Sequence, residues 1–278
     1  MPTTQSCVIL ALDARLSDAA ECLAKRLKAR VISAPEQGYP ITSKSLNRLL
    51  YEKLGLKSGR VFLFGPDGLA LYFYGEQSMR LQVDFLASRI SYRRLKGGGR
   101  GQMIARAVGL KAGKNPSVID ATAGLGTDAF ILASLGCQVH LYERSPEISL
   151  LLESGMEKAR QSNDDEISKI LNRMHFQEGD AKALLLTLTN EPEVVYLDPM
   201  FPPRSKTALV KKEMRLVHDI VGHDPDSDAL LPAALSAATG RVVVKRPRQA
   251  PDLAGLTPDF RQIGKTNRFD VYLTEAGV

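Results

Sequence analysis

The sequence contains the stretch Ser117-Val118-Ile119-Asp120-Ala121-Thr122-Ala123-Gly124-Leu125-Gly126-Thr127-Asp128, which is typical of a strand, a small-residue turn and the start of a helix. Gly124 and Gly126 lack side chains that would keep a bulky ligand away from the backbone, and the following helix begins with free N–H groups. The pattern therefore predicts a nucleoside-binding turn in an α/β sheet.

The residues after this turn favour one kind of nucleoside ligand. A dinucleotide fingerprint needs a third glycine, but Thr127-Asp128-Ala129 follow instead, which disfavours an NAD-dependent oxidoreductase without removing that alternative. Asp128 also places a carboxylate at the helix start, where it would repel a pyrophosphate but favour a cationic or zwitterionic ligand. S-adenosylmethionine (SAM), with its sulfonium and no phosphate, fits this description.

Two further strands are predicted to end in acids at the same edge of the sheet. Gln138–Tyr142 leads to Glu143, and Met174–Gln177 leads to Asp180. Because ligands bind outside the carboxyl ends of parallel strands, Glu143 is placed to bind ribose hydroxyls and Asp180 to accept a hydrogen bond from an adenine amino group.

A fourth strand, Val194–Leu197, is followed by Asp198-Pro199-Met200-Phe201-Pro202. A planar base could stack on Phe201 while Asp198 accepts a hydrogen bond from the exocyclic amine of that base, which holds the nitrogen for methyl transfer. The alternative is a strand that simply leaves the sheet through a proline turn.

These motifs resemble those of class I SAM-dependent methyltransferases over roughly residues 100–278. The run Asp198-Pro199-Met200-Phe201 resembles the (Asp/Asn/Ser)-Pro-Pro-(Tyr/Phe) motif of amino methyltransferases acting on nucleic-acid bases, although Met200 replaces the second proline. The chain is similar to the RsmJ family, the bacterial methyltransferases of guanine N2 in small-subunit (16S) ribosomal RNA. The stretches that carry this similarity are Asp120–Gly126, Tyr196–Pro202, Ala208–Arg215 and Val242–Pro247.

The resemblance implies a fold, a cofactor and a set of site residues. The implied fold is α/β, with a seven-stranded Rossmann-like class I methyltransferase sheet that ends in an antiparallel pair. The pattern of strands and helices before residue 97 separately predicts a small N-terminal α/β domain. The cofactor is SAM, and the implied cofactor-binding residues are Asp120, Gly124, Gly126, Thr127, Asp128, Glu143, Arg144, Gly179, Asp180 and Asp198. The candidate catalytic residues are Asp198, Pro199 and Phe201.

The formal net charge of +6 is unevenly distributed, because no acidic residue lies between Asp84 and Asp120. Basic clusters near the predicted pocket favour a polyanionic partner. The resemblance to the RsmJ family implies that this partner is small-subunit ribosomal RNA or the assembled 30S subunit. The candidate RNA-binding residues are Arg93, Arg94, Lys96, Arg100, Lys211, Lys212, Lys245 and Arg246. For the basic residues between Asp84 and Asp120, the alternative is a solvated linker without an RNA-binding role. Methylation of adenine N6 or of a glutamine amide, and RNA binding without catalysis, also remain open.

The chain is expected to divide into an N-terminal α/β domain, residues 1–96, for RNA recognition and a methyltransferase domain, residues 97–278. The expected N-terminal elements are a strand at Val8–Leu12, a helix at Ser17–Lys28 capped by Ser17, a helix at Ser43–Leu54, a hairpin around Gly65-Pro66-Asp67-Gly68 and a helix at Met79–Arg89. Helices are expected at Thr207–Val221 and Asp226–Ala238, a strand at Gly240–Val244, and a hairpin from Arg261–Ile263 and Phe269–Leu273.

Composition excludes several classes of protein. There is no run of about twenty apolar residues to span a membrane, and the N-terminus lacks the features of a secretory signal. The three cysteines have no paired metal-ligand spacing, so no metal site is predicted. These features predict a cytoplasmic protein; they predict no oligomeric state.

Overall fold

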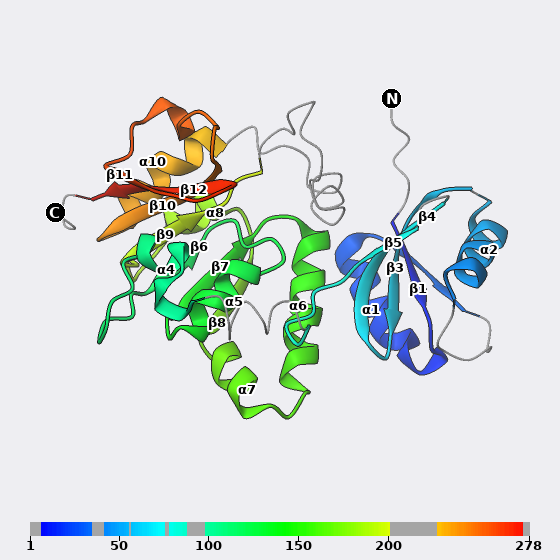
Figure 1. Cartoon of the computed structure of the whole chain (residues 1–278). Coiled ribbons are helices and arrows are strands. Elements are labelled where there is room, and N and C mark those ends of the chain that lie inside the picture. Colours follow the sequence, from blue (N-terminus) through cyan, green and yellow to red (C-terminus); the bar gives the residue numbers. More distant parts are fainter. Residues whose placement is uncertain are drawn as a thin grey trace. The chain divides into compact units, whose positions relative to one another are not determined.

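The computed structural model describes residues 7–34, 42–55, 57–75, 78–87, 98–200 and 227–274. The chain forms two compact units (Figure 1). The first comprises Met1–Asp84 with Leu150–Lys158, and the second comprises Phe85–Ser149 with Ala159–Val278.

The second unit is built on a seven-stranded sheet in the order β11-β12-β10-β9-β6-β7-β8. The strands are β6 (Val118–Asp120), β7 (Val139–Glu143), β8 (Met174–Glu178), β9 (Val194–Leu197), β10 (Arg241–Pro247), β11 (Phe260–Ile263) and β12 (Asn267–Leu273). Strands β6 to β10 are parallel, β12 is antiparallel to β10, and β11 is antiparallel to β12. The predicted sheet and its antiparallel pair are confirmed.

Helices cover both faces of this sheet. They are α4 (Met103–Ala107), α5 (Thr127–Ser134), α7 (Asp165–Leu171), α8 (Ala181–Leu185) and α10 (Ser227–Ala237), with short 3₁₀ turns η2 (Gly99–Gly101) and η3 (Leu253–Gly255). Helix α6 (Pro146–Arg160) contributes residues to both units. On one face α10 contacts α8, η3, β9 and β10, while α5 contacts β7, β8 and α7. Apolar side chains of the strands, such as Val195 and Val242, form the core beneath α8 and α10.

The chain enters the sheet at β6 and adds strands first on one side of β6 and then on the other. It passes from β6 to β7 and β8 on one side, and then returns to β9 and β10 on the other. The strand order therefore reverses between β6 and β9, which is the place where open α/β sheets bind their ligands.

The first unit has its own five-stranded sheet in the order β2-β1-β3-β4-β5. Its elements are β1 (Val8–Ala11), η1 (Ala14–Leu16), α1 (Ser17–Leu27), β2 (Arg30–Ser33), α2 (Ser43–Leu54), β3 (Gly59–Gly65), β4 (Gly68–Tyr74) and β5 (Met79–Leu81). The predicted hairpin is confirmed, with Gly65 opposite Gly68 across its turn. Leu46, Leu49 and Leu50 of α2 pack into the core of this sheet.

Some local expectations were wrong. The helix expected at Met79–Arg89 is absent as far as residue 87, where the described stretch ends. Met79–Leu81 instead forms β5, because pairing with β4 outweighs the helical spacing of its side chains. Ser17 does not cap α1; the 3₁₀ turn η1 precedes that helix, and Asp13 caps η1 by accepting a hydrogen bond from the Arg15 backbone at 2.9 Å. Helices α6 and α7 were not anticipated, and the helix expected at 207–221 lies outside the described residues.

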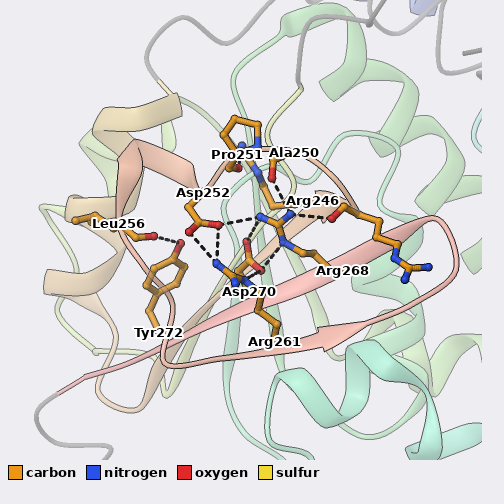
Figure 2. A network of polar contacts seen from close by, with 10 residues as sticks. Arg246, Ala250, Pro251, Asp252, Leu256, Arg261, Arg268, Asp270 and Tyr272 are labelled. Carbon is orange, nitrogen blue, oxygen red and sulfur yellow. Dashed lines mark hydrogen bonds and ion pairs between the residues drawn. The ribbon is translucent and has the colours of Figure 1, made fainter. Parts of the chain in front are cut away.

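A buried ion-pair network ties the loop after β10 to the last two strands (Figure 2). Arg268 donates to both carboxylate oxygens of Asp270, at 2.7 and 2.9 Å, and to Asp252 at 3.0 Å. Its guanidinium also donates to the backbone carbonyls of Arg248 and Ala250. The side chain of Asp270 is 0% exposed and that of Arg268 is 7% exposed, so neither charge can be solvated by water.

None of the helices in the described ranges combines the length and apolar character needed to cross a lipid bilayer.

Candidate active site

The carboxyl ends of β6, β9 and β10 meet at the point where the strand order reverses. Asp120 pairs in register with Tyr196, and Leu197 pairs with Val244. The residues that follow each pair therefore lie at one edge of the sheet, which brings together side chains that are far apart in the sequence.

A lysine bridges two carboxylates at this edge. Lys245 Nζ lies 2.8 Å from Asp128 Oδ2 and 2.7 Å from Asp198 Oδ2. The Tyr196 hydroxyl donates to the same Asp128 oxygen at 2.8 Å. We refer to Asp120, Asp128, Tyr196, Asp198 and Lys245 as the carboxylate–lysine cluster.

Burial and charge act in opposite directions on Lys245. Its side chain is 25% exposed, and burial alone lowers the pKa of its amine. The neighbouring Asp198 and Asp128 raise the pKa by more, so it lies above its ordinary value and the ammonium stays charged. The pKa of the buried Tyr196 hydroxyl is raised well above its ordinary value by burial and by the surrounding carboxylates, so it remains a hydrogen-bond donor.

Asp120 is a carboxylic acid at neutral pH. The residue is 2% exposed, and burial raises the pKa of its carboxyl to about 8, with further raising by Asp128 and Asp198. The Thr122 backbone N–H donates to Asp120 at 3.2 Å, which opposes this shift only in part. The cluster therefore contains one protonated acid next to two ion-paired carboxylates.

The pKa of Asp120 predicts a pH-dependent stability effect. Because the folded pKa of about 8 lies above the unfolded value of about 4, its contribution to stability is present below about pH 4 and is lost as pH rises toward 8. The Asp120→Asn variant has no carboxyl to ionise at this position, so it does not lose this stability. The difference in free energy of unfolding, variant minus wild type, should therefore increase by about 2–4 kcal/mol from about pH 5 to pH 8.

Urea denaturation at several pH values measures this effect, with Asp165→Asn on the exposed first turn of α7 as the matched control. Parallel stability curves for Asp120→Asn and wild type would contradict the protonated state of Asp120.

The glycine turn is held from two sides. Gly124 and Gly126 have φ values of +53° and +71°, in the left-handed region that glycine adopts readily. Glu143 accepts hydrogen bonds from the Gly124 backbone at 2.9 Å and from the Ser145 backbone at 2.8 Å. On the other side, the Asp198 backbone donates to Thr122 Oγ1 at 2.6 Å.

The turn leaves room for a ligand. A side-chain carbon added at Gly124 would meet only the Thr122 carbonyl oxygen, at 3.9 Å, so no side chain covers the backbone at this position. Carboxylates lie beside this turn and the third glycine of the dinucleotide fingerprint is missing, which suits a cationic nucleoside such as SAM.

The other predicted cofactor residues lie at the neighbouring strand ends. The Gly179 backbone donates to the Glu143 carbonyl at 2.8 Å, which joins the ends of β7 and β8. Asp180 is exposed, and its carboxylate caps α8 by accepting hydrogen bonds from Lys182 at 2.8 Å and Ala183 at 3.2 Å. Arg144 is also exposed, directly after β7, while Thr127 begins α5.

Of the two other candidate catalytic residues, Pro199 lies within the described residues and Phe201 does not. Pro199 is buried directly after β9 and fixes the direction in which the chain leaves the sheet. Phe201 lies outside the described residues, so its stacking role stays a prediction.

The predicted RNA-binding residues separate into different environments. Five of them lie outside the described residues: Arg93, Arg94, Lys96, Lys211 and Lys212. Arg100 is exposed and donates to the Lys111 carbonyl at 2.6 Å and to the Asn115 side chain at 2.7 Å, so part of its guanidinium holds local structure.

Lys245 and Arg246, which were expected to bind RNA, do not lie on an exposed basic surface. Strand β10 was expected to end at Val244 but continues to Pro247, so these two side chains alternate between the faces of the sheet. Lys245 joins the carboxylate–lysine cluster. Arg246 is 3% exposed and donates to the Pro251 carbonyl, and burial followed by the charge of Arg268 lowers the pKa of its guanidinium.

Three contributors to the site were missed from the sequence: Thr122, Tyr196 and the bridging role of Lys245. The sequence offered one indication of the role of Lys245, which was the length of the apolar strand. If that strand continues past Val244, the Lys245 side chain lies on the opposite face of the sheet from Val244. Within the described ranges, no group of three or more histidine, cysteine or acidic residues is arranged to hold a metal ion.

Comparisons with known proteins agree with this geometry. The SAM-dependent methyltransferase family matches residues 52–274. A protein of Pseudomonas syringae pv. syringae named ribosomal RNA small subunit methyltransferase J is 52% identical over 212 residues, which cover 76% of this chain and 78% of the relative. A protein of the same name from Aeromonas salmonicida is 49% identical over 238 residues, covering 85% and 92% of the two chains. The crystal structure of a SAM-dependent methyltransferase from Neisseria gonorrhoeae is 34% identical, covers 96% of each chain and superposes with a TM-score of 0.69.

Proposed function

This chain belongs to the SAM-dependent methyltransferase family that includes ribosomal RNA small subunit methyltransferase J, and we propose that it methylates the exocyclic N2 of a guanosine in small-subunit ribosomal RNA. The observation that carries the proposal is the position of Asp198. Its carboxylate stands at the end of β9, beside the open glycine turn, and is ion-paired with Lys245 at 2.7 Å.

The described residues provide a surface for the cofactor. SAM, when bound, supplies a methyl group activated by its sulfonium. Gly124 and Gly126 allow the close approach of a nucleoside, Glu143 lies at the ribose side, and the carboxylates of the cluster favour a positive charge.

Asp198 acts on the target amine in this proposal. The N2 lone pair of guanine is delocalised into the ring, so the site must orient the nitrogen toward the methyl carbon. Asp198 accepts a hydrogen bond from one N–H, and the Pro199 or Met200 carbonyl accepts the other. As the bond from N2 to the methyl carbon forms, the bond from that carbon to the sulfonium sulfur would break and one proton would leave N2. Asp198 would accept this proton.

The substrate side of the proposal rests on RNA recognition outside the pocket. Phe201 stacks the base after it is extruded from its RNA context, and the basic segment around Arg93, Arg94 and Lys96 contacts phosphates. The N-terminal region up to residue 96 serves as the RNA-recognition domain. Small-subunit ribosomal RNA or the assembled 30S subunit is the partner, and the cytoplasm is the compartment.

A labelling experiment tests the proposed activity. The purified protein is incubated with methyl-labelled SAM and either free small-subunit RNA or 30S subunits from cells lacking the modification. Digestion and mass spectrometry are expected to locate the label on guanine N2. Label on adenine N6 or on protein would overturn the substrate assignment, and RNA binding without any transferred label would overturn catalysis.

A further inference from the structure

Lys245 connects two parts of the site that come from separate elements. Asp128 lies in the first turn of α5, which follows the glycine turn, whereas Asp198 follows β9 on the side of the target amine. The lysine itself comes from β10, and its ammonium is within 2.8 Å of one oxygen of each carboxylate. One side chain therefore spans the boundary between the cofactor side and the amine side.

The charges that face Lys245 come from three neighbouring elements. They are Asp120 at the end of β6, Asp128 on α5, and Tyr196 with Asp198 at the end of β9. Below about pH 8 Asp120 is protonated and Tyr196 is neutral, so two carboxylates and one ammonium leave a net charge of −1.

This net charge distinguishes the two forms of the cofactor. The sulfonium of SAM carries a positive charge that the cluster attracts, while the thioether of the demethylated product, S-adenosylhomocysteine, carries none. Removing the ammonium would make the cluster more negative and would also leave the two carboxylates without the group that fixes their separation.

We propose that Lys245 is a positioning residue for methyl transfer, which holds Asp128 and Asp198 at a fixed separation and sets the net charge that faces the sulfonium. The inference rests on the proposed function, because it assumes SAM beside the glycine turn and an amine beside Asp198. The inference adds Lys245 to Asp198 as a residue whose loss slows the reaction. Lys245 does not contact the reacting atoms and acts on them only through Asp128 and Asp198.

Two substitutions separate the geometric effect of Lys245 from its charge. Lys245→Met removes the ammonium, and we expect kcat to fall about 100-fold because Asp198 is no longer held in place. The ratio of the dissociation constant for S-adenosylhomocysteine to that for SAM should rise about tenfold, because the cluster becomes more negative. Lys245→Arg keeps the charge, so the ratio should stay near that of wild type while kcat falls because the guanidinium has a different shape.

Isothermal titration calorimetry with SAM and S-adenosylhomocysteine gives the ratio without any RNA, and single-turnover methylation gives the rate. Lys169→Met, at an exposed position on α7, is the matched control and should leave both unchanged. A purely structural role would weaken both ligands alike and leave the ratio unchanged.

The outcomes distinguish this inference from the proposed function. A wild-type protein that binds no SAM or transfers no methyl group overturns the proposed function. A functional wild type whose Lys245→Met variant keeps its rate and its ligand ratio overturns the role of Lys245. If Lys245→Met does not fold, Lys245→Arg decides, since an arginine variant with the wild-type rate would contradict positioning.

Discussion

Asp198→Ala is expected to lower the rate of methyl transfer by about 1000-fold while changing the affinity for SAM by no more than about tenfold. The substitution removes the carboxylate that accepts the N–H of the target amine, and it also removes one of the two partners of Lys245. The glycine turn and its support from Glu143 stay in place, so most of the cofactor surface remains. Single-turnover methylation and calorimetric titration with SAM measure the two effects separately.

Asp198→Asn provides a near-isosteric second variant, which retains a hydrogen-bond acceptor but neither the charge nor the capacity to take a proton. Its rate should lie between those of wild type and Asp198→Ala. Asp165→Ala on the exposed first turn of α7 is the control for removing an acid away from the site. Full activity of Asp198→Ala on ribosomal RNA would remove Asp198 from the mechanism.

Arg268→Met is expected to lower the free energy of unfolding by about 3–5 kcal/mol, because it leaves the fully buried Asp270 carboxylate without its closest counter-ion. Arg261 also contacts Asp270, at 3.3 Å, but its side chain is 37% exposed and it is a weaker substitute (Figure 2). Urea denaturation followed by circular dichroism measures the loss.

Two further variants identify the cause of that loss. Arg261→Met should cost about 1 kcal/mol, since its side chain is 37% exposed and Arg268 still neutralises Asp270. The double variant Arg268→Met with Asp270→Leu should recover most of the stability lost by Arg268→Met, because the buried Asp270 carboxylate is removed together with its closest counter-ion. A double variant less stable than Arg268→Met alone would show that packing, and not the unpaired carboxylate, sets the cost.

Much of the fold followed from local sequence patterns. Apolar runs that end in an acid, such as Val194–Leu197 before Asp198, predicted strand ends at one edge of the sheet, and the structure confirms these strands. The glycine turn could also be predicted from the sequence, because Gly124 and Gly126 are close together and glycine readily adopts the left-handed backbone conformation found at both positions.

What the sequence could not specify depends on contacts between distant segments. The bridge from Lys245 to Asp128 needs the register of β10 against β9 and the position of α5, and neither is encoded near residue 245. Met79–Leu81 has helical spacing, yet a neighbouring strand determines its conformation. The inward turn of Arg246 likewise depends on how far β10 extends, which basic composition alone does not reveal.

The antiparallel pairing of β12 along the whole of β10 affects the order in which the site can form during translation. Phe269 lies opposite Lys245, so the strand that carries the bridging lysine has its outer neighbour only after residues 267–273 have left the ribosomal tunnel. Until then β10 is an open edge, a state in which exposed backbone can pair with other chains. The strand that carries Lys245 therefore gains support on both sides only after β12 has paired with it.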